Sequence, residues 1–314
     1  MLGCLILSET GPGNNIPAVE CPLEICYFGP MRIALAQIAP RLGDVRGNLE
    51  IHLEAAARAR KAGADLLVFP ELSLTGYKLR DLVESVAADP ARDKAVRALV
   101  AASRGLALVF GFVEEKPSEK GLFYNSAVFA AGGKIVHIHR KVFLPTFGLF
   151  EEARFFAPGR NVGTFETPWG RMGLLICRDF LHLNAGYLLF AGGAETMIVI
   201  SAAPGRGLSV PKGFASSRMW ELMGEAMGRF AQAFVVYSNR VGFEDGVAFA
   251  GGSFLYNPMG ENLGQAAYFE PDLLVREIDP GEVRKARKNW PFKRDDKPEV
   301  TLAALERIVH GYDD

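Results

Sequence analysis

Long uncharged apolar runs are missing from this sequence, and their absence excludes one class of protein. No stretch reaches the roughly 18 consecutive apolar residues that a membrane-spanning helix needs. The opening residues also lack a basic segment followed by an apolar one, which is the pattern of a secretory signal peptide. We therefore expect a soluble, cytoplasmic protein with no membrane partner.

An excess of charge of one sign is also lacking. The chain has 35 Lys and Arg against 36 Asp and Glu, a formal net charge of -1, and no long basic run. Proteins that bind nucleic acid neutralise phosphates with clustered Lys and Arg. We therefore expect no nucleic-acid partner.

Cysteine is scarce and unevenly placed, with four residues in 314. Cys4, Cys21 and Cys26 lie near the start of the chain, which leaves Cys177 alone in the remainder. This spacing matches neither a disulfide framework nor a paired zinc motif. The phosphate-binding glycine motifs are missing too, so we expect neither a metal nor a nucleotide cofactor.

What the sequence does have is a regular mixture of strand and helix patterns without a linker-like break. We interpret residues 1–30 as an N-terminal extension outside the native fold, because a strand pattern starts directly at Met31. Residues 31–280 are predicted to form one α/β domain of two sheets flanked by helices. Residues 281–314 are predicted to be a polar tail that is either solvated or in contact with another subunit.

The predicted elements follow from hydrophobic periodicity and from the positions of Gly and Pro. Strands are expected over 32–38, 65–69, 107–113, 125–129, 134–139, 164–167, 171–176, 196–200, 234–238, 247–249, 253–256, 265–269 and 273–277, and helices over 48–61, 79–87, 91–103, 181–191, 212–232 and 302–308.

Three polar residues share one position in this pattern, because Glu71, Lys141 and Cys177 each follow an apolar strand. Ligands of open α/β sheets gather at the carboxyl ends of strands, where side chains leave the packed interior. A free thiol has a pKa of roughly 8.5 and needs a base or a cation nearby to react at neutral pH. A carboxylate and an ammonium could serve this purpose in acyl transfer.

Each of these residues taken alone has a simpler interpretation. Glu71 could be a helix cap or an ion-pair partner, Lys141 a solvated strand end, and Cys177 a buried core residue. The amino-acid sequence around all three residues favours the catalytic interpretation. The segments FPELSLTGY at 69–77, HRKVFLP at 139–145 and LICRD at 175–179 resemble the nitrilase superfamily of carbon–nitrogen hydrolases in sequence, order and spacing.

Within that superfamily the strongest likeness is to the glutaminase domain of glutamine-dependent NAD synthetase. The segments that carry it are LPTFGLFEEARFF at 144–156, VYSNRVG at 236–242 and FAGGS at 249–253. No pyrophosphatase motif is recognisable in the 314 residues, so we expect that the chain does not itself make NAD. The resemblance spans roughly residues 31–278.

The resemblance implies a four-layer αββα sandwich that pairs with a second copy as a homodimer. It also implies a Glu/Lys/Cys triad formed by Glu71, Lys141 and Cys177, which hydrolyses an amide through a Cys thioester without metal or organic cofactor. Glu152 corresponds to a second family glutamate that orients the lysine and the substrate amide. The alternative for Glu152 is an exposed loop acid.

The same resemblance places three aromatic residues, Tyr77, Phe147 and Phe150, on the pocket wall, although composition alone would assign them to the core. Arg178 departs from the glutaminase pattern, in which an acidic residue commonly follows the cysteine. A cation there disfavours free glutamine and favours an amide or carbamoyl compound that carries a carboxylate. The alternative is that Arg178 turns away and pairs with Asp179 or Glu152.

Three functions therefore remain open from the sequence. The first is an amidase acting on a small amide or an N-carbamoyl compound. The second is a glutaminase-type subunit that supplies ammonia to a partner, and the third is a non-catalytic relative that binds or scaffolds another protein. Retention of all three triad residue types favours an enzyme.

Overall fold

The computed structural model describes residues 29–207, 209–210 and 213–311. Residues 1–28 of the predicted N-terminal extension lie outside the described residues, and so do Cys4, Cys21 and Cys26. The first described element is the strand β1, which begins at Met31 as the sequence pattern predicts.

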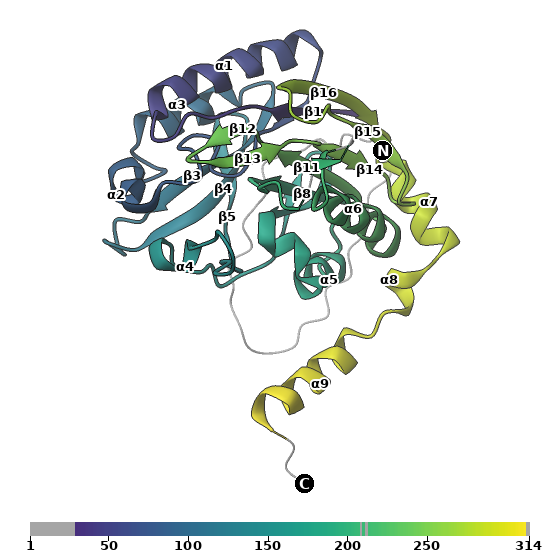
Figure 1. Ribbon diagram of the computed structural model, residues 1–314. Coiled ribbons are helices and arrows are strands. Elements are labelled where there is room, and N and C mark those ends of the chain that lie inside the picture. Colours follow the sequence, from purple (N-terminus) through teal and green to yellow (C-terminus); the bar gives the residue numbers. More distant parts are fainter. Residues whose placement is uncertain (1–28, 208, 211–212, 312–314) are drawn as a thin grey trace.

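Two six-stranded sheets face each other and form the centre of the fold (Figure 1). The first sheet has the order β16-β1-β2-β3-β4-β5, and the second has the order β15-β14-β11-β8-β7-β6. The strands of the first are β1 (Met31–Gln37), β2 (Leu66–Val68), β3 (Ala107–Glu115), β4 (Phe123–Ala131), β5 (Lys134–Arg140) and β16 (Asp272–Ile278). Those of the second are β6 (Thr164–Thr167), β7 (Gly170–Ile176), β8 (Thr196–Ser201), β11 (Phe234–Asn239), β14 (Phe254–Tyr256) and β15 (Asn262–Gln265).

Alternation along the strands of the first sheet separates two hydrophobic cores. On β1, Ile33 and Leu35 pack into the core shared with the second sheet, whereas Ala34 and Ala36 pack into a core on the opposite face. Because successive strand side chains point to opposite faces, a fully apolar strand is buried on both sides. This explains why the central residues of β1, from Ile33 to Ala36, are all apolar.

Helices cover the outer face of each sheet. The helices α1 (Val45–Lys61) and α3 (Lys94–Ala102) place Ala59 and Leu99 in the outer core of the first sheet. The helices α5 (Leu183–Ala191) and α6 (Ser217–Ala231) lie on the other side of the molecule, against the second sheet (Figure 1). The fold is thus the predicted four-layer αββα sandwich.

Parallel pairing brings the ends of several strands to the same edge. Strands β1, β2 and β3 are mutually parallel, and β7, β8 and β11 form the corresponding parallel group of the second sheet. Strand β5 runs in the direction of β3, because both are antiparallel to β4. The chain that leaves β2, β5, β7 and β8 therefore emerges at neighbouring points.

The structure corrects several details of the predicted elements. The helix predicted over 212–232 begins only at Ser217, because β9 (Ser209–Val210) and β10 (Gly213–Phe214) pair before it. The strand predicted over 265–269 ends at Gln265, where β15 stops pairing with β14. The hairpin partner β12 (Val241–Glu244) of β13 (Val247–Ala250) and the short helix α4 (Glu152–Phe155) were not predicted.

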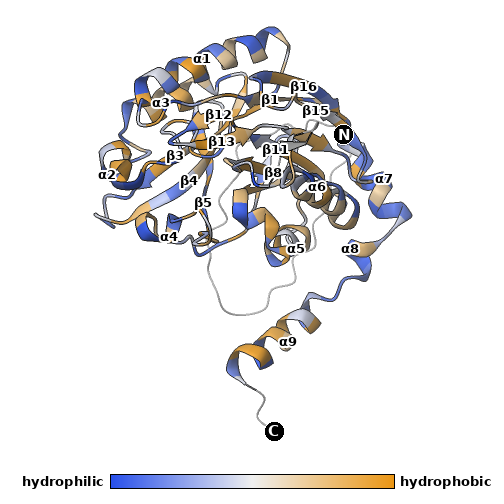
Figure 2. Cartoon of the chain, viewed as in Figure 1, coloured by the Kyte–Doolittle hydropathy of each residue, from blue (hydrophilic) through white to orange (hydrophobic). Residues whose placement is uncertain are grey.

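The segment predicted as a tail is helical in the structure. It contains α7 (Gly281–Asn289), α8 (Phe292–Asp295) and α9 (Pro298–His310). Val283 and Ala286 of α7 are buried against the body. In contrast, α9 projects away from the body and has no buried residue, although it carries several apolar side chains (Figure 2). Among the described residues, no helix combines the length and the hydropathy that crossing a membrane requires.

Three shorter elements complete the described chain. They are the 3-10 helix η1 (Arg80–Leu82), the one-turn helix α2 (Val83–Val86) and the 3-10 helix η2 (Cys177–Leu181). The helix predicted over 79–87 is therefore two short turns rather than a continuous helix. The 3-10 helix η2 starts at the residue that follows β7, which sets the direction of the chain after Cys177.

Gly111 of β3 allows the backbone after Glu71 to lie directly on the first sheet. A Cβ atom at this position would be 2.3 Å from the backbone nitrogen of Leu72.

We expect Gly111→Ala to lower the free energy of unfolding by about 3 kcal/mol, because the clash is with backbone and cannot be relieved by a rotamer change. Urea unfolding measures this, with Gly163→Ala as the control, since its nearest neighbours are 3.7 Å away. Equal stability of the two variants would contradict the interpretation.

Candidate active site

The three strand-end residues singled out in the sequence converge on one buried site. Glu71 follows β2, Lys141 follows β5 and Cys177 follows β7, and all three are buried. Lys141 Nζ donates to Glu71 Oε1 at 2.7 Å. The charges of Glu71 and Lys141 both act on the pKa of the Cys177 thiol, which places the three groups in one electrostatic environment.

The Glu71 carboxylate is held in place by three hydrogen bonds. Its Oε1 accepts from Lys141 Nζ and from Asn125 Nδ2, both at 2.7 Å. Its Oε2 accepts from the backbone N–H of Ala202 at 2.7 Å. A carboxylate oxygen has two lone-pair sites, so Oε2 keeps one site for a further proton donor. Glu71 is therefore fixed in orientation and still able to accept a proton.

Lys141 lies between two carboxylates, since its Nζ also donates to Glu152 Oε1 at 2.7 Å. Burial alone lowers the pKa of this amine, but the negative charges of Glu152 and Glu71 outweigh burial and raise it above its ordinary value. The side chain is an ammonium at any pH near neutrality. Lys141 is thus a fixed cation and not a proton acceptor.

Glu152 opens the short helix α4 and is almost fully buried, which excludes the alternative of an exposed loop acid. Its Oε1 also accepts from the hydroxyl of Tyr77 at 2.6 Å. Its Oε2 is buried and has no hydrogen-bond partner among the described residues. Burial raises the pKa of Glu152 to about 7, against the opposing effect of Lys141. A buried acceptor without a hydrogen-bond partner destabilises the folded protein unless a ligand donates a hydrogen bond to it.

The backbone at Tyr77 is held by Glu244, the last residue of β12. Glu244 Oε1 accepts from the backbone N–H of Tyr77 at 2.8 Å and from that of Lys78 at 2.6 Å. Glu244 in turn pairs with the buried guanidinium of Arg240. The hydrogen-bonded chain from Arg240 to Lys141 therefore links β12 to the centre of the site.

Cys177 occupies a strained backbone conformation, with φ of +46° at the junction of β7 and η2. Residues other than Gly seldom adopt positive φ, and such strain tends to occur at functional sites. Burial raises the pKa of the thiol, and the negative charge of Glu71 raises it further, against the opposing effects of Lys141 and Ser201. The resting group is therefore a thiol, and a base has to remove its proton when it reacts.

Asp179 fastens the turn at Cys177 to the end of β5. Its Oδ1 accepts from the backbone N–H groups of Val142 and Phe143 at 3.0 and 2.9 Å. Its Oδ2 accepts from the backbone N–H of Ile176 at 3.2 Å and lies 2.8 Å from His139 Nε2. This fully buried carboxylate therefore fixes the relative position of the segments that carry Lys141 and Cys177. It also excludes the pairing of Arg178 with Asp179 that the sequence left open.

A pocket with about 430 Å³ of space opens onto Cys177. Phe147, Phe150 and Arg178 contribute to its wall, whereas Tyr77 lines a separate pocket of about 320 Å³ together with Glu152. The complete lining of the pocket at the cysteine consists of Pro145, Phe147, Phe150, Cys177, Arg178, Leu181, Ala203, Pro204, Arg206, Ser216, Met219 and Trp220. Among the described residues, no three His, Cys, Asp or Glu side chains are arranged to hold a metal ion.

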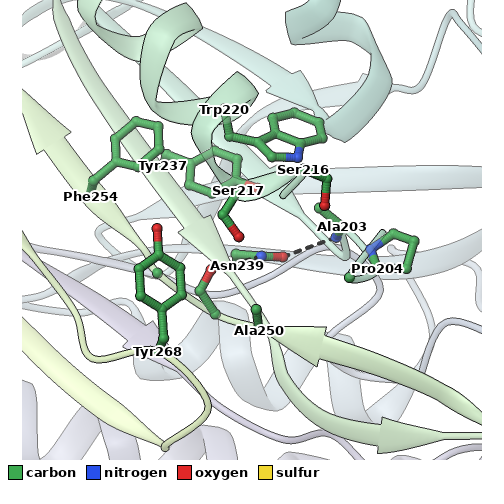
Figure 3. Close-up of a pocket in the computed structure, with 13 residues that line it drawn as sticks. Ala203, Pro204, Ser216, Ser217, Trp220, Tyr237, Asn239, Ala250, Phe254 and Tyr268 are labelled. Atoms are coloured by element: carbon green, nitrogen blue, oxygen red, sulfur yellow. Dashed lines mark hydrogen bonds between the residues drawn. The ribbon is translucent and has the colours of Figure 1, made fainter. Parts of the chain in front are cut away.

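A second pocket of about 280 Å³ shares Ala203, Pro204, Ser216 and Trp220 with the first (Figure 3). Its wall is rich in hydroxyl and amide groups, and Asn239 Oδ1 accepts from the backbone N–H of Ala203 at 3.0 Å. The hydroxyl of Tyr237 in this wall is buried and has no hydrogen-bond partner among the described residues. Polar space therefore adjoins the largely apolar pocket at the cysteine.

This site and this fold correspond to one known family. The family model for carbon–nitrogen hydrolases matches residues 32–288. The chain therefore belongs to the carbon–nitrogen hydrolase family of the nitrilase superfamily.

Two curated relatives and one solved structure illustrate the similarity. The chain is 34% identical over 248 residues to a glutamine-dependent NAD(+) synthetase from Acinetobacter baylyi, a match that covers 79% of this chain and 44% of the synthetase. It is 34% identical over 269 residues to an (R)-stereoselective amidase from Pseudomonas sp, with coverage of 84% and 91%. The chain thus spans less than half the length of the synthetase and most of the length of the amidase.

The solved structure is that of a mutant amidase from Nesterenkonia sp. AN1 with the acetamide moiety of fluoroacetamide added covalently at its active-site cysteine. The TM-score is 0.73 and the identity 26%, and the match covers 88% of this chain and 97% of that amidase. The whole fold, and not only a central motif, is therefore shared with an amidase of known structure.

The sequence analysis does not identify several residues that support the site. Asn125 begins a predicted strand and carries no charge, so the local sequence gives no signal that it belongs to the site. The sequence offers Asp179 only as a partner of Arg178, although its position two residues after the cysteine is consistent with a role in the turn. Glu244 had no usable signal, because the strand that ends there was not predicted.

The raised pKa of Glu152 predicts how stability changes with pH. A carboxyl whose pKa rises from 4.5 to about 7 on folding stabilises the protein below pH 4.5, and this contribution is lost as pH rises to 7. Glu152→Gln removes the ionisation. The free energy of unfolding of the variant relative to the parent should therefore increase by about 3 kcal/mol between pH 4.5 and 7.5. Urea unfolding across this range, with exposed Glu50→Gln as the control, measures it. Parallel pH profiles of Glu152→Gln and the parent would contradict the assignment.

Proposed function

We propose that the protein is an amidase that hydrolyses the C–N bond of a small amide or N-carbamoyl compound through a thioester on Cys177. The observation that carries this proposal is the buried Lys141 ammonium shared by Glu71 and Glu152 beside a strained cysteine at the end of a pocket. The covalent adduct at the active-site cysteine of the similar amidase supports the cysteine as nucleophile.

The first half of the reaction forms the thioester. Glu71 takes the proton of the Cys177 thiol through its free Oε2 site as the sulfur attacks the carbonyl carbon of the amide. The negative charge that develops on the carbonyl oxygen is stabilised by the Lys141 ammonium and by the backbone N–H of Arg178. Glu71 then gives the proton to the leaving nitrogen, and ammonia or an amine departs as the C–N bond breaks.

The second half of the reaction regenerates the enzyme. Glu71 removes a proton from a water molecule as its oxygen attacks the thioester carbon, the C–S bond breaks, and the thiol recovers its proton from Glu71. The free Oε2 of Glu152 accepts a hydrogen bond from the amide or carbamoyl N–H of the substrate, which satisfies the buried acceptor. Lys141 remains an ammonium throughout. A nucleophilic thiol that must stay reduced also favours a reducing compartment such as the cytoplasm.

Similarity to the synthetases supports a second candidate, a glutaminase-type subunit that supplies ammonia to a partner. The two candidates share the thioester chemistry and differ in substrate. They are separated by comparing glutamine with simple amides, because only the second candidate requires glutamine to be the preferred substrate.

The nucleophile is tested by trapping. With hydroxylamine present, the parent protein should convert a reactive amide to its hydroxamate, because hydroxylamine intercepts the acyl group on Cys177. Cys177→Ala should form neither hydroxamate nor ammonia, since no thioester can form. The control is Ser103→Ala, a buried residue outside the site. Absence of both products from the parent across a broad panel that includes glutamine would refute the enzyme proposal and favour a binding or scaffold role.

We also propose that two copies of the chain pair through the layer formed by α5 and α6. Leu183 and Leu188 of α5 and Leu222 and Phe230 of α6 are exposed, and exposed apolar side chains gathered on one layer are typical of an interface. The apolar residues of the projecting helix α9 offer further surface to the same partner. A homodimer would cover these side chains.

Sedimentation velocity tests the pairing. The parent should sediment as a dimer, and the double variant Leu183→Glu, Leu222→Glu should shift towards the monomer, because burying carboxylates in an apolar interface is unfavourable. Leu122→Glu, at an exposed position outside this layer, serves as the control. A monomeric parent at all concentrations would contradict the proposal.

A further inference from the structure

Two guanidinium groups converge on one aromatic ring at the wall of the pocket that holds Cys177. The Cζ atoms of Arg178 and Arg206 each lie 5.1 Å from the centroid of the Phe147 ring. Their Cζ atoms are therefore at most about 10 Å apart, which is within the distance over which charges interact at ordinary ionic strength. Each cation gains some stabilisation from the ring face, but the two cations repel each other.

Neither cation is neutralised within the described part of the chain. Arg178 and Arg206 form no ion pair there, and Glu151, which follows Phe150 of the pocket wall in sequence, lies within reach of Arg80 and Arg154 instead. The pocket wall contains no Asp or Glu. Two unpaired cations and an apolar remainder make the pocket complementary to an anion that is joined to an apolar chain.

Both arginines are anchored at their backbones. Arg206 N–H donates to Ser216 Oγ at 3.0 Å, and its carbonyl accepts from the N–H of Ser216 at 3.1 Å. Arg178 belongs to η2 and directly follows the cysteine. The loop that carries Phe147 lies beside Arg206, because a Cβ on Gly148 would be 3.5 Å from its Nη2 atom. The cationic end of the pocket is therefore assembled from three separate segments.

We infer that Arg178 and Arg206 bind a carboxylate at the end of the substrate remote from the scissile amide. This inference rests on the proposed function, and it narrows the substrate to an amide or N-carbamoyl compound that carries a carboxylate and no free amine. A guanidinium binds a carboxylate through two parallel hydrogen bonds, and two guanidiniums provide donors for both oxygens. An α-ammonium, as in free glutamine, would meet two cations and no carboxylate in this wall. Arg206, which the sequence did not indicate, is a substrate-specificity residue in this assignment.

The test compares substrates that differ only in charge. Succinamate, glutaramate and adipamate are each paired with the neutral amide in which an isopropyl group replaces the carboxylate, and glutamine is assayed beside glutaramate. The parent should prefer the best anionic amide over its neutral counterpart by about a hundredfold in kcat/KM, which corresponds to two charge-assisted contacts of about tenfold each. Raising the salt concentration should reduce this preference, because these groups are partly exposed.

Substitution of Arg178 and Arg206 tests whether these residues cause the preference for the anionic amide. Arg178→Gln and Arg206→Gln should each lower the ratio of anionic to neutral kcat/KM by about tenfold, and the double variant should lose most of the preference. Arg46→Gln, at an exposed position on α1, should keep the ratio of the parent. A parent that prefers the neutral amide, or an Arg206→Gln variant with an unchanged ratio, would overturn the inference while leaving the amidase proposal intact. A parent that prefers glutamine would also overturn the inference, and it would favour the glutaminase-type candidate, which uses the same thioester chemistry.

A binding measurement separates the two proposals if catalysis is absent. Without turnover or acyl trapping from any amide, the amidase proposal fails. Calorimetric titration with glutarate then decides the carboxylate site by itself. Binding to the parent that weakens about tenfold or more in the double variant supports the site, and equal binding to both proteins overturns it.

Discussion

The buried ammonium of Lys141 is the interaction on which the rest of the site depends. It lies 2.7 Å from an oxygen of Glu71 and 2.7 Å from an oxygen of Glu152. One cation between two buried carboxylates leaves a net negative charge away from water, which is costly unless every group is closely hydrogen-bonded. At Glu71, Asn125 and the backbone N–H of Ala202 donate hydrogen bonds to the carboxylate. At Glu152, one carboxylate oxygen has no hydrogen-bond partner among the described residues. Burial raises the pKa of Glu152 to about 7, and its unpartnered oxygen provides a place for a polar ligand.

The supports of this cluster come from distant parts of both sheets. Asp179 joins the turn at Cys177 to the loop after β5, and Glu244 holds the backbone of Tyr77 from a hairpin beyond β11. None of these carboxylates lines the pocket at the cysteine. The acids are thus concentrated among and around the reacting groups, and the pocket wall contains two cations and no acid. This separation of charge connects the chemistry of the site to the choice of substrate.

Much of the architecture could be predicted from local pattern. Apolar strands such as β1 and β7 were predicted within a residue or two, because a strand buried on both faces needs an uninterrupted apolar run. The predictions were wrong where pairing overrides local preference. The helix α6 begins at Ser217, later than predicted, because β9 and β10 form a two-stranded pair before it. The strand β12 was not predicted, because its backbone pairs only with β13 across a turn. The boundaries of the extension and tail remain predictions.

By itself, the sequence determined the fold class, the family and the three strand-end residues, because each of these depends on residue type and on spacing along the chain. Only the tertiary structure decided which side chains share the Lys141 ammonium, that Glu152 is buried, and that Asp179 supports the turn and does not pair with Arg178. It alone brought Arg206 to Arg178, because these residues lie on segments that no local pattern relates. Distances across the sheets depend on packing between strands distant in sequence, and the spacing of residues along the chain does not encode them.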